Sequence, residues 1–371
     1  MKFKSIFLIY SIIFSLAVFS PELYASTKDR HENISESANE DHHGDEATEE
    51  EEFNPSEFIF EHIGDSHEWH LFTLPNGHHV SIYLPVIVYS KTAGLNIFSS
   101  RHLAHGHHYR GFMIMQEGDL EGEIVEVDDE GHVNEENMPL DLSITKNVAS
   151  MLVVAVILLW LFISLANSYR KTGISEPKGI QGFLEPVVLF VRDDIAIPNI
   201  GEEKYSRYMA YLLTVFFFIL LNNLMGLVPF FPGGANVTGN IAVTFTLAAF
   251  TMIIINFTGT KNYWKHIFNT PGVPWWLKVP LPLMPIVELI GVITKPFALM
   301  IRLFANITAG HIIVLSLVGL IFIFKSVAFS PVSIIMVLFM YCIELLVAFL
   351  QAYIFTLLSA LFIGLAVQEQ H

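Results

Sequence analysis

The sequence predicts an all-α polytopic membrane protein: three ordinary spanning helices and a long, steeply tilted helical hairpin, preceded by a signal peptide and a small β-rich extracytoplasmic domain. Three observations predict this class. Of the 371 residues, 53% are hydrophobic, and the mean hydropathy of +0.51 is rare for a soluble globular domain. Apolar stretches of spanning length recur from residue 148 onward, and the last two are far longer than one crossing requires. The charged residues gather instead in the first third.

The charge distribution divides the chain into two unlike modules that join near Lys146. Residues 26–146 hold 26 Asp and Glu against 6 Lys and Arg, whereas residues 147–371 hold 9 against 12. The formal net charge of -16 therefore belongs to the first module, and the membrane module is slightly basic. Thirteen of the 16 histidines also lie in the first module.

Residues 1–25 have the layout of a secretory signal peptide. Lys2 and Lys4 precede an apolar core, and Ala25 stands before a polar segment. Leu23 fits the small-residue rule for cleavage poorly, so an uncleaved signal anchor stays open as the alternative. In either case the next segment is exported.

The exported part is predicted to contain a disordered segment followed by a small folded domain. Residues 26–57 are rich in Glu, Asp and His and hold hardly any large apolar residue before Phe53, so they bury too little surface to fold. Residues 58–137 contain short alternating stretches between turn signals, which predicts a β-rich domain. The clearest stretches are Trp69–Leu74, Val80–Val88 and Ile124–Val127.

The histidines of the first module invite a metal interpretation, but their spacings match no defined zinc site and no cysteine supports them. We therefore expect solvated or locally satisfied histidines and no metal site, with weak divalent-metal binding or pH sensing as the alternative. The main clusters are His42-His43, His78-His79, and His102 with His105, His107 and His108. The only cysteine, Cys342, lies in an apolar run and is expected to be a buried, inert thiol.

Three apolar stretches have the length of ordinary spanning helices: about Val148–Asn167, Met209–Phe231 and Asn240–Phe257. The segment between the first two holds six Lys and Arg, whereas the loop 232–239 holds none. By the positive-inside rule, the first helix leads into the cytoplasm. The N-terminal domain is then extracytoplasmic, and the C-terminus is cytoplasmic.

The last two apolar stretches are too long for ordinary crossings. Residues 283–324 and 333–367 would form helices of about 63 and 52 Å, against a hydrocarbon core of about 30 Å. Ordinary tilt cannot absorb that excess. We expect two long, steeply oblique helices that pack as an antiparallel hairpin through a connection at residues 325–331.

Four polar groups lie inside the predicted hairpin: Arg302, His311, Glu344 and Gln351. An intramembrane arginine costs about 2.5 to 3.5 kcal/mol on insertion scales and cannot lose its proton, so it usually faces a bundle interior or a water-filled path. A helix-end arginine that snorkels to the headgroups is the alternative. In a constant antiparallel register, Arg302 can lie level with Gln351 and His311 level with Glu344. Gln351 also lies within about 20° of Glu344 around its helix.

The helical angles separate two environments. At about 100° per residue, Asn306 lies near the face of Arg302, whereas His311 lies about 180° from it. A histidine and a carboxylate in contact are both titratable near neutral pH, so the pair of His311 with Glu344 fits a proton relay; a structural buried pair is the alternative. Glu288, fourteen residues before Arg302, is a further candidate station.

At these residues the sequence closely resembles the a subunit of the rotary F-type ATP synthase, over about residues 139 to 371. The matching motifs are Asn223–Pro229 (NLMGLVP), Asn240 with Thr244, Glu288 ahead of Lys295-Pro296, Arg302–His311 (RLFANITAGH), and Glu344 followed by Leu350–Phe355 (LQAYIF). The resemblance implies an a-subunit membrane domain over residues 138–371. The export signal on a multispanning protein fits a bacterial inner membrane.

The resemblance implies a proton-translocating stator subunit that is not an enzyme on its own. Two offset half-channels would deliver protons to the c-subunit ring and remove them, with Na⁺ left open as the coupling ion. Partners would be the c ring, the b-subunit peripheral stalk, the rest of the F0F1 complex and the lipid bilayer, with no cofactor and no nucleic acid. Arg302 would meet each ring carboxylate, with Gln351 as its neighbour. The proton path would include His311, Glu344, Asn306, Glu288 and Asn240.

Many bacterial members of that family carry an acid where this chain has His311 and a histidine where it has Glu344, so the pair survives with its members exchanged. The resemblance says nothing about the role of residues 26–137. Two other classes of protein are alternatives. A His-rich divalent-metal transporter would need ligands clustered at mid-membrane, where Arg302 would repel a dication. A structural anchor for an extracytoplasmic sensor would leave Arg302 and Glu344 without a purpose.

Overall fold

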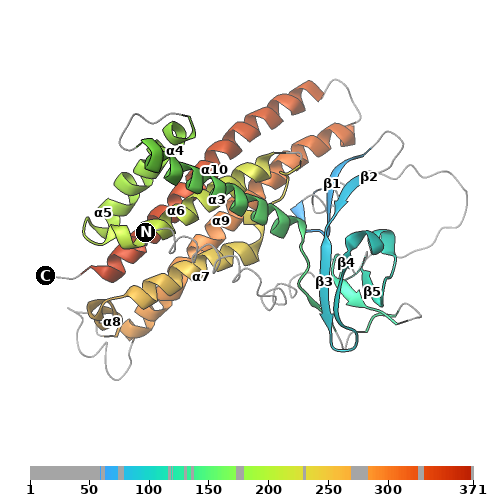
Figure 1. Cartoon of the computed structure of the whole chain (residues 1–371), viewed down its shortest axis with the longest axis horizontal. Coiled ribbons are helices and arrows are strands. Elements are labelled where there is room, and N and C mark those ends of the chain that lie inside the picture. The colour runs from blue at the N-terminus through green and yellow to red at the C-terminus, as the bar shows by residue number, and fades with distance from the viewer. Residues whose placement is uncertain are drawn as a thin grey trace, which may run out of the picture.

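A computed structural model describes most of the chain after residue 62. The described residues are 59, 63–73, 79–115, 118, 120–128, 132–134, 138–172, 179–228, 231–268, 283–324 and 330–368. The expected signal peptide (1–25) and acidic segment (26–57) lie outside them. Figure 1 shows a small domain of strands at one end of a bundle of long helices. The β-rich domain and the helical membrane part both occur as the sequence predicts.

The small domain consists of three short antiparallel sheets, with strand orders β1-β2, β4-β3-β7 and β5-β6. Its core is a cluster of buried side chains from β3, β5, β6 and the turn after β4: Val86, Val88, Leu103, Phe112 and Ile124. The strands are β1 (Glu68–Thr73), β2 (His79–Tyr83), β3 (Pro85–Ser90), β4 (Gly94–Ser99), β5 (Phe112–Ile114), β6 (Ile124–Glu126) and β7 (Leu140–Asp141).

Two expectations for this domain need correction. The stretch Val80–Val88 is not one strand, because its pairing partner changes at Leu84. The Leu84 N–H still donates to the His67 carbonyl, whereas β3, which follows, pairs with β4 and β7. Pro85, which has no N–H, begins the new strand. The domain also extends past residue 137, since β7 pairs with β3 through Val88 and Tyr89.

The helical part contains five helices that are long and apolar enough to cross a membrane, counted over the described residues. The chain is therefore a multi-pass membrane protein. Both long segments form continuous helices, and the connection at 325–329 lies outside the described residues. The five are α3 (Lys146–Thr172), α6 (Tyr205–Leu227), α7 (Ile241–Thr258), α9 (Leu283–Phe324) and α10 (Ser330–Val367). Shorter elements are α4 (Ile180–Phe190), the π-helix η5 (Val191–Ala196), α5 (Ile197–Ile200), η6 (Val237–Gly239) and α8 (Lys261–Phe268).

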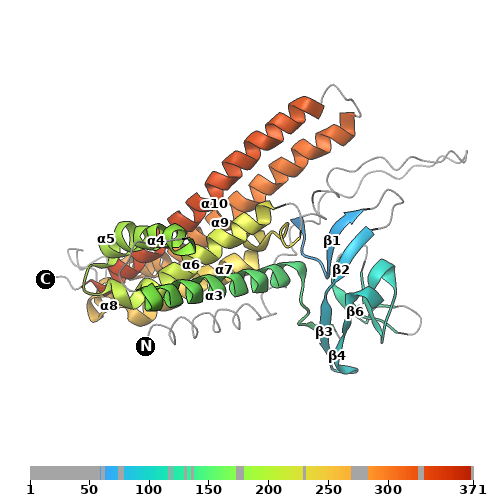
Figure 2. The same cartoon turned by 45° about the horizontal axis from the view of Figure 1, so that its top comes forward.

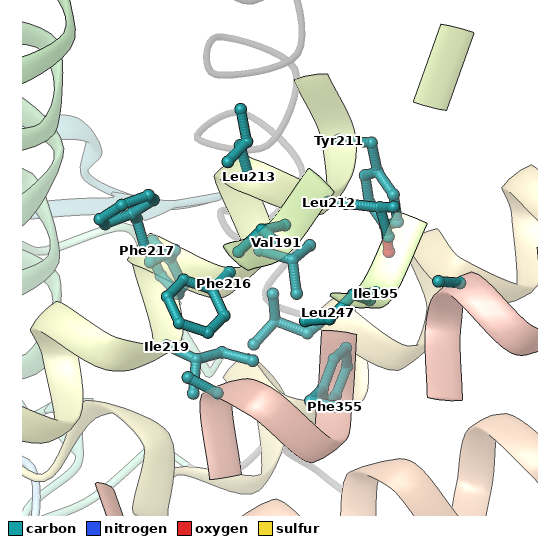
Figure 3. Packing of buried hydrophobic residues seen from close by; sticks show 14 of the residues in the cluster. Val191, Ile195, Tyr211, Leu212, Leu213, Phe216, Phe217, Ile219, Leu247 and Phe355 are labelled. Atoms are coloured by element: carbon teal, nitrogen blue, oxygen red, sulfur yellow. The ribbon is translucent and has the colours of Figure 1, made fainter. Parts of the chain in front are cut away.

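The main core forms around α6, the most buried of the five long helices. Figure 3 shows Val191 of η5 and Phe216 of α6 packed beside Leu247 of α7 and Phe355 of α10. Aromatic and branched residues on all sides of α6 are buried, so this helix lies inside the bundle. The helices α9 and α10 instead leave much of their apolar surface exposed. These exposed faces are available to lipid or to other protein chains.

The helices α9 and α10 run antiparallel, side by side, in both views (Figures 1 and 2). Two contacts far apart along the hairpin fix their register. Near the connection, the Ser333 hydroxyl donates to the Leu317 carbonyl. Near the other end, Nζ of Lys295 lies 5.7 Å from the ring centre of Phe362. The register therefore stays nearly constant along the hairpin, as predicted. Cys342 is exposed on α10, so the expectation of a buried thiol is wrong.

The small domain is fixed to the helices at the start of α3 and at the loop after α6. Asp65 accepts hydrogen bonds from the Thr145 hydroxyl (2.8 Å) and the Asn147 N–H (3.0 Å). The indole N–H of Trp69 donates to the Gly233 carbonyl at 3.2 Å, and its ring meets Phe231 edge to face at 5.1 Å. Trp69 is 4% exposed. Strand β1 is thus attached directly to the α6–η6 loop.

We expect Trp69→Ala to loosen the small domain from the bundle. Truncation of a buried tryptophan typically costs about 3 to 5 kcal/mol, and here it also leaves the Gly233 carbonyl without its donor. Protease digestion of the full chain in lipid nanodiscs should then cut the small domain severalfold faster. The matched control is Trp160→Ala on α3, where the ring is exposed. Equal digestion rates for the two variants would refute the attachment.

Candidate functional site

A cavity of about 290 Å³ lies between α6, α9 and α10. Four of the residues expected to form the site line it, namely Asn306, His311, Glu344 and Gln351, and Asn223 of α6 joins them. Most of the remaining lining is aliphatic. The cavity therefore gathers the polar groups of the hairpin in apolar surroundings, where interactions between charges are screened less than in water.

His311 and Glu344 face each other across the hairpin. Nδ1 of His311 lies 3.9 Å from Oε1 of Glu344, and the carboxylate side chain is 9% exposed. That separation is longer than a hydrogen bond, and Oε1 is buried without a hydrogen-bond partner among the described residues. The other edge of the imidazole lies beside the backbone of Gly226. A small movement, or one bridging water, would connect the two titratable groups.

Two glycines make room for this pair, and the sequence reasoning missed both roles. A Cβ on Gly310 would lie 2.5 Å from Oε1 of Glu344, so the carboxylate occupies the space that a side chain would take. A Cβ on Gly226 would lie 3.5 Å from Nε2 of His311 and 3.2 Å from the Ala235 carbonyl oxygen. The open side of Gly310 is therefore filled by Glu344 of the same hairpin.

Asn223 connects three elements at the edge of the cavity. Its Nδ2 donates to the Ala348 carbonyl of α10 at 3.3 Å, and its Oδ1 accepts from the Thr238 hydroxyl of η6 at 2.6 Å. This is the interhelical adhesion expected of an amide in a membrane helix. Because Asn223 also lines the cavity, it belongs to the site as well as to the packing.

Arg302 lies apart from this cavity, on the exposed side of α9. Within the described part of the chain it makes no hydrogen bond or ion pair, and none joins it to Gln351. Gln351 is 2% exposed and lines the cavity. Around Arg302 the exposed positions of α9 include the small residues Ala298 and Ala305. The chain thus presents a permanent cation on an open apolar surface with small neighbours.

Two expected path residues lie elsewhere. Asn240 does not line the cavity and is not inside a helix: it is the N-cap of α7, where its Oδ1 accepts from the Ala242 N–H at 2.9 Å. Glu288 lies near Tyr263 of α8. It is about 35 Å from His311 along α9, at 1.5 Å per residue. The structure therefore brings together the other members of the expected path but not these two.

A test of the cavity geometry compares two glycines of the same helix. Gly310→Ala should displace the Glu344 carboxylate, because something must move to admit the methyl group, and should therefore slow severalfold the gradient-driven transport that the resemblance implies. Gly291→Ala is the matched control, since a Cβ there meets nothing within 4 Å. Alanine in a helix interior is favoured over glycine by about 0.5 to 1 kcal/mol, so this control should keep full activity. Equal activity of both variants would contradict the crowding inferred at Gly310.

No metal centre is found among the described residues, in which no three His, Cys, Asp or Glu side chains gather closely enough to hold an ion. His102 of the first module instead stacks on Tyr109, with ring centres 4.5 Å apart. His67 lies 3.0 Å from a carboxylate oxygen of Asp141. Burial alone would raise the pKa of Asp141, but hydrogen bonds from His67 and Ser143 outweigh it and hold the pKa below its usual value.

Comparison with known proteins finds two matching families. Residues 148–364 match the family described as ATP synthase A chain, and residues 58–142 match a domain of unknown function (DUF8433). A protein of Chloroherpeton thalassium named ATP synthase subunit a is 49% identical over 237 residues, which cover 62% of this chain and 68% of that relative. One of the same name from Pelodictyon phaeoclathratiforme is 45% identical over 275 residues, 71% of this chain and 78% of the relative.

Proposed function

This chain belongs to the ATP synthase A chain family, whose model spans more than half of its residues, and from that premise we propose that it is the proton-conducting stator of an F-type ATP synthase. Membership makes it a non-catalytic, ion-translocating subunit of the membrane sector. In the proposal, it forms two half-channels against the c ring, and the b-subunit stalk holds it in place. The small domain lies in the periplasm, and the C-terminus lies on the cytoplasmic side of the inner membrane.

The observation that carries the proposal is the separation of Arg302 from the acid–histidine pair. A buried arginine without a partner would be costly, yet Arg302 lies on an open apolar face with no partner among the described residues. Such a cation is suited to meet an acid that another chain brings to it. The small neighbours Ala298 and Ala305 leave room for a helix of that chain.

In the proposed mechanism, protons enter through the cavity and reach the ring by way of His311 and Glu344. The 3.9 Å gap between Nδ1 and Oε1 is short enough for transfer through one water. Gln351 and Asn306 line the same cavity and offer further hydrogen-bonding groups toward the ring. The ring carboxylate then turns through the lipid in its neutral form, since an ionised group there would be expensive.

Release of the proton requires the ring carboxylate to ionise again. Arg302 favours that ionisation. A nearby cation favours the ionised form of a carboxylate, and an arginine keeps its charge at every physiological pH. The same fixed charge repels a proton that would pass directly between the two half-channels. Each 100 mV of membrane potential supplies about 2.3 kcal/mol per proton, so several protons must cross for each ATP made.

Because Glu288 lies near α8, we propose a different role for it in the proton path. If α8 is on the cytoplasmic side, Glu288 belongs to the exit half-channel rather than beside His311. Asn240 keeps a structural part as the cap of α7. A divalent-metal transporter is not favoured, because the cavity brings together only one histidine and one carboxylate, and no three His, Cys, Asp or Glu side chains gather to hold an ion among the described residues.

Isolation of the intact complex from membranes tests the proposal. We expect the chain to purify with a ring of small proteolipids and the b-type stalk, and the reconstituted complex to make ATP under an imposed proton gradient. A sodium gradient in the presence of a protonophore would identify the alternative ion. Purification of the chain alone, or with soluble sensor proteins and no ring, would overturn the proposal.

A further inference from the structure

One face of the β4-β3-β7 sheet is apolar and uncovered. Its exposed side chains are Tyr89 (50%), Leu95 (61%), Ile97 (60%) and Leu140 (43%), and the half-buried Ile87 lies between them. Successive side chains of a strand point to opposite faces of the sheet, so Val86 and Val88 lie in the domain core. The five residues named above lie on the other side, and we call them the outer apolar face. The solvent face of an antiparallel sheet is normally polar. A contiguous apolar face of this kind marks an interaction surface.

The strand pairing makes the outer apolar face continuous. Tyr89 pairs with Leu95 on one side and with Leu140 on the other, and Ile87 pairs with Ile97. These cross-strand neighbours have Cβ atoms about 4.5 to 5.5 Å apart, so their side chains touch. No charged residue interrupts the face along β3 or β4. The exposed Lys91 stands at its margin, in the turn between the two strands.

The outer apolar face is turned toward the membrane side of the domain. Figure 1 shows β5, and Figure 2 shows β6, on the side of the sheet away from the helix bundle, which leaves the outer apolar face on the bundle side. Leu140 also lies only six residues before Lys146, where the first span begins. Six residues reach at most about 20 Å. The sheet is therefore held close to the level at which the lipid begins.

We propose that the outer apolar face rests on the lipid surface beside the helix bundle, so that the small domain is a peripheral membrane-binding module of the subunit. Its chemistry fits lipid: aliphatic side chains meet the acyl boundary, Tyr89 has the amphipathic ring favoured at membrane interfaces, and Lys91 can reach headgroup phosphates. The contact continues the lipid contact that the adjoining span α3 already makes. This inference depends on the membrane topology and not on proton movement.

The test uses the full chain within its complex, in single-complex lipid nanodiscs, with Cys342→Ser as the background. An environment-sensitive fluorophore is placed by Ile97→Cys on the outer apolar face. In a second sample it is placed by Glu121→Cys, at the exposed β5–β6 turn on the far side of the domain. Doxyl-labelled lipid should quench the fluorophore at 97 severalfold more than the one at 121, and iodide should do the reverse.

A variant that removes the apolar character of the face supplies the second measurement. Adding Leu95→Asp to the Ile97→Cys sample should lower quenching by doxyl-labelled lipid severalfold and raise quenching by iodide, because the charged face leaves the lipid. Strong iodide quenching at 97 without Leu95→Asp would overturn the proposal and leave the face in water. Protection at 97 from both quenchers would also overturn it, and would identify another protein subunit as the occupant.

Discussion

Arg302→Ala is expected to abolish ATP synthesis driven by the proton gradient in vesicles that contain the complex. The variant removes the only charge that the described part of α9 presents near mid-helix on its open face. In the proposed mechanism, nothing else favours the ionised ring carboxylate at the exit, and nothing else separates the two half-channels. The substitution touches no hydrogen bond or ion pair among the described residues, so the chain should still fold and assemble. The measurement is ATP formed after an acid–base jump.

The matched control is Lys295→Ala, which removes another cation two turns earlier on the same helix. Lys295 lies over the ring of Phe362 at 5.7 Å and has no place in the proposed proton path. A cation–π contact at an exposed site is worth only about 0.5 to 1 kcal/mol, so this variant should assemble and synthesise ATP. Gradient-driven synthesis retained in Arg302→Ala, with Lys295→Ala unimpaired, would remove Arg302 from the mechanism.

The hairpin could be predicted from the sequence because two independent constraints agree on it. The lengths of the two apolar segments exceed one crossing, and the polar residues fall into one antiparallel register. His311 and Glu344 meet as that register requires, because helix geometry leaves few other solutions once the direction is fixed. Glu344 and Gln351 also share the cavity, as their angular spacing predicts.

What the sequence did not reveal depends on neighbours from outside the hairpin. The helical angles place Glu288 on one face of α9. They do not reveal that this residue lies near Tyr263, because α8 is outside the hairpin. Gly226 belongs to α6, and the imidazole of His311 lies beside it, a contact that no pattern within α9 and α10 reveals. In the small domain, β5 and β7 have two or three residues each, too few to carry an alternating pattern.

The His311–Glu344 pair offers the second decisive test, because the two residues can be exchanged. The single changes His311→Glu and Glu344→His each leave two groups of the same kind facing one another. Two carboxylates repel, and two histidines lack the acid partner. We expect either change to lower gradient-driven synthesis by about 10²-fold, the lower end of the range for loss of a proton-transferring group. ATP formation after an acid–base jump measures both.

The double exchange His311→Glu with Glu344→His should recover much of the lost rate. The 3.9 Å contact joins side chains from two helices across a shared cavity, so one acid and one histidine remain opposed whichever helix carries each. Gly310 and Gly226 leave space beside both positions for the exchanged side chains to settle. If the pair acts as a unit, the effects of the single changes will not add. A double variant as slow as the product of the two single losses would show that the residues act separately, and the relay between them would have to be abandoned.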